Sequence, residues 1–147
     1  MRAVVQRVRQ ARVIVDNETT GSIDLGLLVY IGVAKGDQLA QSEWLAHKIS
    51  ELRIFPSEKH AIDRSLIDSG GSALIVSQFT LLADARKGRR PSFVEAAPAN
   101  LAEPLIKAVC EQLRVLGVTV AEGRFGAHMQ VESTNDGPVT IILDSEA

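Results

Sequence analysis

Apolar and polar positions alternate in several segments of the chain, and this pattern predicts strands. Residues 2–15 alternate loosely and are followed by a turn signal at Asp16-Asn17-Glu18. Residues 26–34, GLLVYIGVA, form an unbroken apolar run, as expected of a strand covered on both faces. Residues 72–82, SALIVSQFTLL, follow the turn signal Gly70-Gly71 and predict a further strand.

Two other segments carry apolar residues at helical spacing. The first helix is expected from a cap at Asp37 to about residue 52, and the second over roughly residues 101–116. The start of the second helix is ambiguous, because Asn100 and Glu103 resemble a capping box but a proline then follows where a backbone donor is needed. Residues 56–71 show no period and are expected to be irregular.

The C-terminal part predicts three short strands, at about residues 118–121, 128–134 and 139–144. Asn135-Asp136-Gly137 lies between the last two and is a strong hairpin signal, and Pro138 is tolerated at the start of the next strand. Many strands and two main helices, without regular alternation of strand and helix, predict a single α+β domain over residues 1–147. Its sheet is expected to be antiparallel or mixed, or barrel-like.

Composition narrows the class of protein. Of the 147 residues, 46% are hydrophobic and 23% charged, as in a globular domain, and the net charge of −2 gives no general attraction to nucleic acid. The single cysteine, Cys110, excludes an internal disulfide and fits a reducing compartment. The longest nearly apolar run, residues 73–83, is too short to cross a bilayer, and the basic N-terminal residues do not form a secretory signal. We therefore expect a cytoplasmic protein with no membrane partner.

The common catalytic motifs do not occur in this sequence. It contains no phosphate-binding glycine loop and no G-x-S-x-G motif of an α/β-hydrolase. His47, His60 and His128 are far apart and show no metal-ligand spacing, so each is interpreted as a surface or packing residue. Cys110 lies inside the second expected helix, where a small buried side chain is the usual role. We expect neither a metal nor another cofactor.

Three stretches remain as candidates for chemistry. Residues 77–84, SQFTLLAD, are either the solvent side of a strand or a strand end whose hydroxyl and N–H groups meet a substrate carbonyl. Residues 85–93, ARKGRRPSF, are either a solvated turn or a basic loop for a phosphate backbone. Residues 133–142, STNDGPVTII, are either a hairpin corner or a fixed piece of backbone with a chemical role.

The order and spacing of these stretches resemble those of the D-aminoacyl-tRNA deacylase family. The similar segments are SQFTL at 77–81, RKGRRPSF at 86–93, GRFGAHMQV at 123–131 and NDGPVT at 135–140, together with MRAVVQRV and GLLVYIGVAKGD nearer the N-terminus. The resemblance covers essentially the whole chain, and the pairing of S-Q-x-T with N-x-G-P-V-T is specific to the family. The chain departs from the commoner pattern at Leu82, at Ala85 and near residues 63–64, where an aromatic, a hydroxyl residue and an asparagine are expected.

The resemblance implies an enzyme that hydrolyses the ester between a D-amino acid, or glycine mischarged on tRNA-Ala, and the 3′ end of tRNA. It further implies a homodimer with active sites at the subunit interface. Gly137 and Pro138, joined by a cis peptide bond, would reach into the site of the other subunit and reject L-amino acids through their carbonyl groups. The residues that would line the ester site are Ser77, Gln78, Phe79 and Thr80.

The resemblance also implies roles around this site. Four residues would support the Gly137-Pro138 pair or the terminal adenosine, namely Arg7, Met129, Asn135 and Thr140. The alternative for Arg7 is a surface arginine on a strand, and the alternative for Met129 is core packing. Four cations would hold the acceptor stem of the tRNA, namely Arg86, Lys87, Arg89 and Arg90.

Two routes of hydrolysis stay open. Thr80 could act as nucleophile, but the motif offers no general base beside it. Alternatively, the 2′-hydroxyl of the terminal ribose activates water, and the N–H of Phe79 or Thr80 holds the oxyanion, which is the route we favour. Two other functions stand beside the leading one: a non-catalytic RNA-binding module that uses the basic loop alone, and a small-molecule esterase that acts through Thr80.

Overall fold

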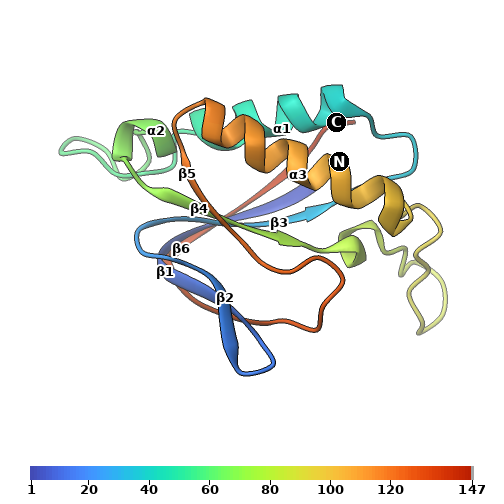
Figure 1. Ribbon diagram of the computed structural model, residues 1–147. Helices are drawn as coiled ribbons and strands as arrows, with labels where there is room; N and C mark the ends of the chain where they lie inside the picture. The colour runs from blue at the N-terminus through green and yellow to red at the C-terminus, as the bar shows by residue number, and fades with distance from the viewer. Residues whose placement is uncertain (147) are drawn as a thin grey trace.

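The computed structural model describes residues 1–146, which form one curled sheet with helices on one side (Figure 1). In chain order the elements are β1 (Arg2–Val15), β2 (Glu18–Ile23), β3 (Gly26–Gly32), α1 (Leu39–Glu51), α2 (Leu66–Ser69), β4 (Ser72–Ser77), the 3-10 turn η1 (Phe79–Leu82), α3 (Ala99–Val115), β5 (Thr119–Glu122) and β6 (Gln130–Asp144).

The sheet is mixed, and its strands follow the order β2-β1-β3-β4-β5, with β6 on the other edge of β1. β1 is antiparallel to β2, β3 and β6, whereas β3–β4 and β4–β5 are parallel pairs. The backbones of Gly21 in β2 and Glu122 in β5 approach so closely that no Cβ fits at Gly21, and the sheet therefore curls almost into a barrel. The expected α+β class and the mixed, barrel-like sheet are confirmed.

Two parallel strands that are neighbours in a sheet need a crossover connection between them. Here α1 and α2 join β3 to β4, and α3 joins β4 to β5. The expectation of no strand–helix alternation was therefore wrong for the middle of the chain. The strand–helix–strand pattern was hard to recognise in the sequence because a long, aperiodic segment separates α1 from β4. Only the short helix α2 forms in this segment.

Apolar side chains pack on both sides of the sheet. One cluster fills the space between the sheet and helices α1 and α3, and includes Val29, Ile31 and Leu45. A second lies inside the curled sheet and includes Val8, Leu28 and Leu74. β3 contributes to both clusters, which explains its unbroken apolar run and confirms that it is covered on both faces.

Both helices begin at residues other than those expected. The N-cap of α1 is Gln38, which forms a capping box with Gln41, while the Asp37 carboxylate accepts a hydrogen bond from the Ala34 N–H at 2.7 Å. α3 starts after Pro98 instead of at Asn100, so that Pro104 falls inside the helix. Within residues 1–146, no helix has the length and apolar character needed to cross a membrane.

Candidate active site

The chain leaves the sheet at the end of β4, earlier than the apolar pattern predicts. Residues 72–82 are not one strand, because the ladder ends at Ser77 and Phe79–Leu82 form the turn η1. The Gln78 N–H still donates to the Ile31 carbonyl at 2.7 Å, which holds η1 beside the end of β3. Gly32 makes this close approach feasible, since a Cβ there would collide with the Gln78 carbonyl and the Leu82 side chain.

Two backbone donors are available in this turn. As the first residues of a 3-10 turn, Phe79 and Thr80 have N–H groups with no acceptor in the turn, and they make no other hydrogen bond within residues 1–146. The Thr80 hydroxyl accepts a hydrogen bond from the Gln78 amide, and no carboxylate or imidazole of the described residues is hydrogen-bonded to it. The turn therefore supplies exposed donors but no general base.

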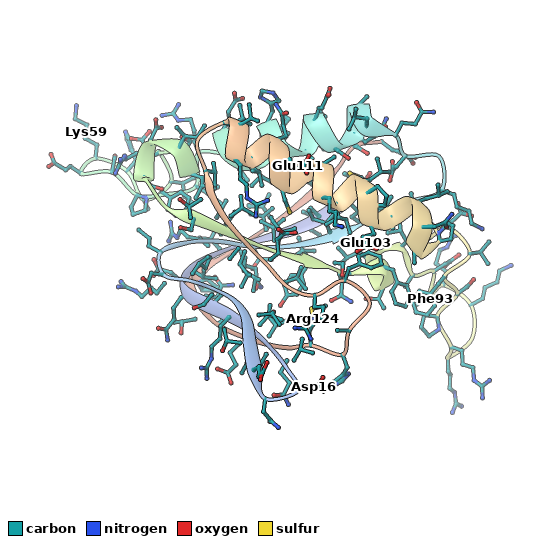
Figure 2. All side chains as sticks on the ribbon, in the orientation of Figure 1. Asp16, Lys59, Phe93, Glu103, Glu111 and Arg124 are labelled. Atoms are coloured by element: carbon teal, nitrogen blue, oxygen red, sulfur yellow. The ribbon has the colours of Figure 1, made fainter. Side chains whose placement is uncertain are left out.

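A pocket of about 430 Å³ opens next to these donors. Its walls come from the end of β4, from η1, from the first turns of α3 and from the segment that leads into β6. Figure 2 shows Glu103 on α3 and Arg124 after β5, which mark the two segments on either side of this region. Most of the lining is apolar, and the residues that bear on the site are Ser77, Gln78, Phe79, Phe125, His128 and Met129.

The basic loop follows η1 directly. Backbone hydrogen bonds in both directions between Asp84 and Ser92, at 2.8 and 2.9 Å, close its base. The Asp84 carboxylate pairs with Arg86 at 2.7 Å, and hydrogen bonds from that guanidinium hold the pKa of Asp84 well below its ordinary value. Lys87, Arg89 and Arg90 have no carboxylate within ion-pair distance in the part of the chain described, so their charges face solvent.

The Gly137-Pro138 pair is not at a hairpin corner. β6 is one strand, and residues on both sides of the pair bond to the same partner β1, with Asn135 opposite Val8 and Thr140 opposite Gln6. Residues 136–139 therefore form a wide bulge opposite Arg7, and the Gly137-Pro138 peptide bond is cis. The hairpin expectation was wrong because a turn signal also suits a bulge, and sequence does not say which strand each half joins.

Three side chains hold this bulge. Arg7, only 8% exposed, donates from Nε to the Asp136 carbonyl at 2.9 Å and from Nη1 to the Ile54 carbonyl at 2.7 Å. The Asn135 amide oxygen accepts from the Val139 N–H at 3.0 Å, and its Nδ2 donates to the Thr140 hydroxyl at 3.1 Å. Gly137 and Pro138 themselves are exposed, so a braced backbone segment projects from the surface.

The structure thus places the expected site residues in two separate groups. Ser77, Gln78, Phe79 and Met129 meet at the pocket, with Thr80 beside it, whereas Arg7, Asn135, Gly137, Pro138 and Thr140 gather at the bulge. From the ladder pairings, the two groups lie about 13 Å apart along the strands and about 14 Å apart across them. Within one chain the bulge is therefore out of reach of the pocket.

Several residues of the pocket wall were not predicted from the sequence. Phe125 and Gly126 lie in the motif GRFGAHMQV but were not singled out, and His128, interpreted as a surface or packing residue, is exposed at the pocket. Ala102 and Ile106 line the pocket from α3. The sequence does not distinguish them from ordinary core residues on the apolar face of a helix. Cys110 is 1% exposed, as expected, and burial raises its pKa to about 12.

No cluster of three or more His, Cys, Asp or Glu side chains suitable for a metal ion occurs among residues 1–146. The described residues of the site supply N–H donors, a largely apolar pocket and a nearby group of cations. Such an arrangement can hold a nucleoside and stabilise a negatively charged oxygen.

Known proteins similar to this chain match over its whole length. The sequence profile of the family described as D-Tyr-tRNA(Tyr) deacylase matches residues 4–144. The D-aminoacyl-tRNA deacylase of Thermomicrobium roseum is 59% identical over 145 residues, which cover 99% of this chain and 94% of the relative. The D-aminoacyl-tRNA deacylase of Thermotoga petrophila is 53% identical over 145 residues, which cover 99% of this chain and 97% of the relative.

Two solved structures share the fold of this chain. A chain named c-Myc DNA Unwinding Element Binding Protein superposes with a TM-score of 0.92 at 40% identity and covers 100% of both chains. A probable eukaryotic D-amino acid tRNA deacylase shares the fold, with a TM-score of 0.83 at 20% identity and 97% of each chain covered. The resemblance found in the motifs is confirmed, and the chain belongs to the D-Tyr-tRNA(Tyr) deacylase family of enzymes.

Proposed function

We propose that this protein hydrolyses the ester bond of D-aminoacyl-tRNA in the cytoplasm, acts as a single domain and releases free D-amino acid and tRNA. The observation that carries the proposal is the pair of N–H groups at Phe79 and Thr80, which have no partner in the described residues and lie beside a nucleoside-sized pocket. Membership of the deacylase family supports the choice of substrate.

In this reaction the terminal adenosine occupies the pocket, with Phe125 and Met129 against its base. The ester carbonyl then lies at η1, where the N–H groups of Phe79 and Thr80 donate to the oxygen that becomes negative as water attacks. Water adds its hydroxyl to the carbonyl carbon, the bond to the ribose 3′-oxygen breaks, and the proton ends on that oxygen. One such N–H donor raises the rate of the chemical step by a factor of about 10²–10³.

The terminal ribose 2′-hydroxyl is the group that activates water in this proposal. Thr80 is exposed, its hydroxyl accepts from the Gln78 amide, and no base of the described residues is bonded to it. An unassisted threonine is a weak nucleophile. Substrate-assisted attack requires only that the chain position the ester, which the donors and the pocket can do.

Selection of the D-enantiomer is assigned to Gly137 and Pro138 of the second subunit in a homodimer. The bulge is exposed and too far from the pocket of its own chain, whereas a partner chain can place it there. The two carbonyl oxygens accept hydrogen bonds from the substrate ammonium and leave no room for an L side chain. Glycine has no side chain to exclude, so glycyl-tRNA-Ala is hydrolysed as well.

The bracing contacts of the bulge serve this selection. A pocket that is 1 Å looser admits the wrong enantiomer, so the filter must be held on a rigid support. Arg7 ties the Asp136 carbonyl to the Ile54 carbonyl, and Asn135 with Thr140 closes the other side. The cations Lys87, Arg89 and Arg90, with Arg86, hold phosphates of the acceptor stem.

One assay tests the proposal. D- and L-aminoacyl-tRNA that carry the same amino acid are incubated with the protein, and loss of the ester is followed over time. We expect rapid hydrolysis of the D-ester and none of the L-ester above the spontaneous rate. Equal rates for both enantiomers would indicate an unselective esterase, and binding without hydrolysis of either would indicate an RNA-binding module.

A further inference from the structure

Two aromatic rings are exposed side by side at the edge of the pocket. Phe79 is 57% exposed and Phe93 is 36% exposed, although phenylalanine is usually buried. Their ring centroids lie 5.1 Å apart at an interplanar angle of 69°, which is an edge-to-face pair. Val94, next in the chain, is 64% exposed and extends the apolar surface.

The pair lies between the pocket and the basic loop. Phe79 lines the pocket, and Phe93 follows Ser92, whose backbone bonds with Asp84 close the base of the loop. Figure 2 shows Phe93 at the side of the molecule where this loop projects. Lys87, Arg89 and Arg90 lie in this loop, between Phe79 and Phe93 in the chain, and have no ion pair among the described residues.

Exposed aromatic faces next to unpaired cations are the combination that binds single-stranded nucleic acid, because bases stack on the rings and phosphates follow the positive charge. The 3′ end of a tRNA is unpaired. If its last nucleoside fills the pocket and its ester lies at η1, the strand leaves through the pocket opening, where Phe79 and Phe93 stand.

We propose that Phe79 and Phe93 form a stacking platform for the base of the penultimate nucleotide of the tRNA, and that the loop cations hold the phosphates on either side of it. This inference rests on the proposed function and adds to it a second nucleotide subsite. The platform contacts any base through its π face, so it contributes affinity for the acceptor end without reading its sequence.

The test replaces Phe93, which does not line the pocket. Phe93→Leu keeps an apolar contact with Phe79 but removes the flat ring, Phe93→Tyr keeps the ring, and Val115→Ala, at a 78% exposed position at the end of α3, is the control. Three substrates are compared: D-aminoacyl-tRNA, the same tRNA without its penultimate base, and D-aminoacyl-adenosine, which has no second nucleotide.

With intact tRNA we expect Phe93→Leu to raise KM about tenfold with little change in kcat, and the other two variants to match the unaltered protein. With the abasic tRNA and with D-aminoacyl-adenosine, Phe93→Leu should match the unaltered protein too. An equal loss on all three substrates would show that Phe93 only supports η1 by packing, and an unchanged KM on intact tRNA would show that no base stacks there; either result overturns the proposal.

Binding separates this inference from the proposed function. Uncharged tRNA with 2-aminopurine at the penultimate position is titrated with each variant, and the quenching of its fluorescence reports stacking without any hydrolysis. We expect quenching with the unaltered protein and with Phe93→Tyr, and about tenfold weaker binding with Phe93→Leu. Quenching that Phe93→Leu leaves intact refutes the platform, whereas absent hydrolysis of D-aminoacyl-tRNA with quenching preserved refutes only the proposed reaction.

Discussion

Replacing Arg7 with lysine tests how the Gly137-Pro138 bulge is held. The Arg7 guanidinium donates to two carbonyl groups that belong to different segments, Asp136 at 2.9 Å and Ile54 at 2.7 Å. An ammonium carries all its donors on one atom and is shorter, so it cannot reproduce this bridge. At least one buried carbonyl is then left without its charged donor.

The size of the effect follows from these contacts. A hydrogen bond to a charged group contributes about 1.5–3 kcal/mol, so Arg7→Lys should lower the free energy of unfolding by roughly 2–3 kcal/mol. Arg7→Met leaves both carbonyl groups without this donor and should lower the free energy of unfolding by about 2–6 kcal/mol, at about 1–3 kcal/mol for each. Urea denaturation followed by circular dichroism measures the change. Under the proposed function, Arg7→Lys should also raise hydrolysis of L-aminoacyl-tRNA relative to the D-ester.

Arg9 provides a matched control two residues away. Its side chain is 73% exposed, and its Nε lies 3.6 Å from Oδ1 of the Asp136 carboxylate. An exposed pair of this kind contributes about 0–1 kcal/mol, so Arg9→Lys should change neither stability nor the D/L ratio appreciably. If Arg7→Lys and Arg9→Lys have the same stability, the bridge does not hold the bulge and our reasoning about it is wrong.

Three further predictions concern the turn, the loop and the core. Thr80→Ala should keep kcat within about tenfold if the tRNA 2′-hydroxyl activates water, and single-turnover kinetics at saturating enzyme measure it; a loss of several orders of magnitude with unchanged binding would support a threonine nucleophile. Lys87→Gln or Arg89→Gln should weaken tRNA binding and lower the slope of log K against log salt by about 0.7–0.9 each, which titrations at several salt concentrations check. Burial raises the Cys110 pKa from 9.0 to about 12, so the neutral thiol is the folded form and stability falls as pH rises from about 9 towards 12, by at most about 1.4 kcal/mol per pH unit. Cys110→Ala should remove that part of the slope in urea titrations, and an unchanged slope would contradict it.

Local patterns predicted most of the secondary structure because each element carries its own period. The alternation in residues 2–15 and the apolar run from residue 26 predicted β1 and β3, and helical spacing predicted α1 and α3 to within a few residues. The helix starts were wrong because capping depends on which residue adopts an extended conformation. At α1 that residue is Gln38, since Asp37 bonds elsewhere.

Long-range pairing was beyond the reach of local patterns. Asn135-Asp136-Gly137 carries a hairpin signal, yet both halves of β6 join β1, and the same residues form a bulge. The apolar run over residues 72–82 gave no sign that the ladder stops at Ser77, because the end of a strand depends on where its neighbour β3 ends. The two crossovers through α1 and α3 depend on pairing in the same way.

The sequence by itself determined the family, through motifs spread over the whole chain, and with it the residues that were expected at the site. Tertiary structure alone decided how those residues are grouped. It places Ser77, Gln78 and Phe79 at a pocket completed by α3, and it places Gly137 and Pro138 at a bulge too distant to serve that pocket in the same chain. The physical reason is that a motif specifies chemical groups and local conformation, whereas the distance between two motifs is set by strand order and register.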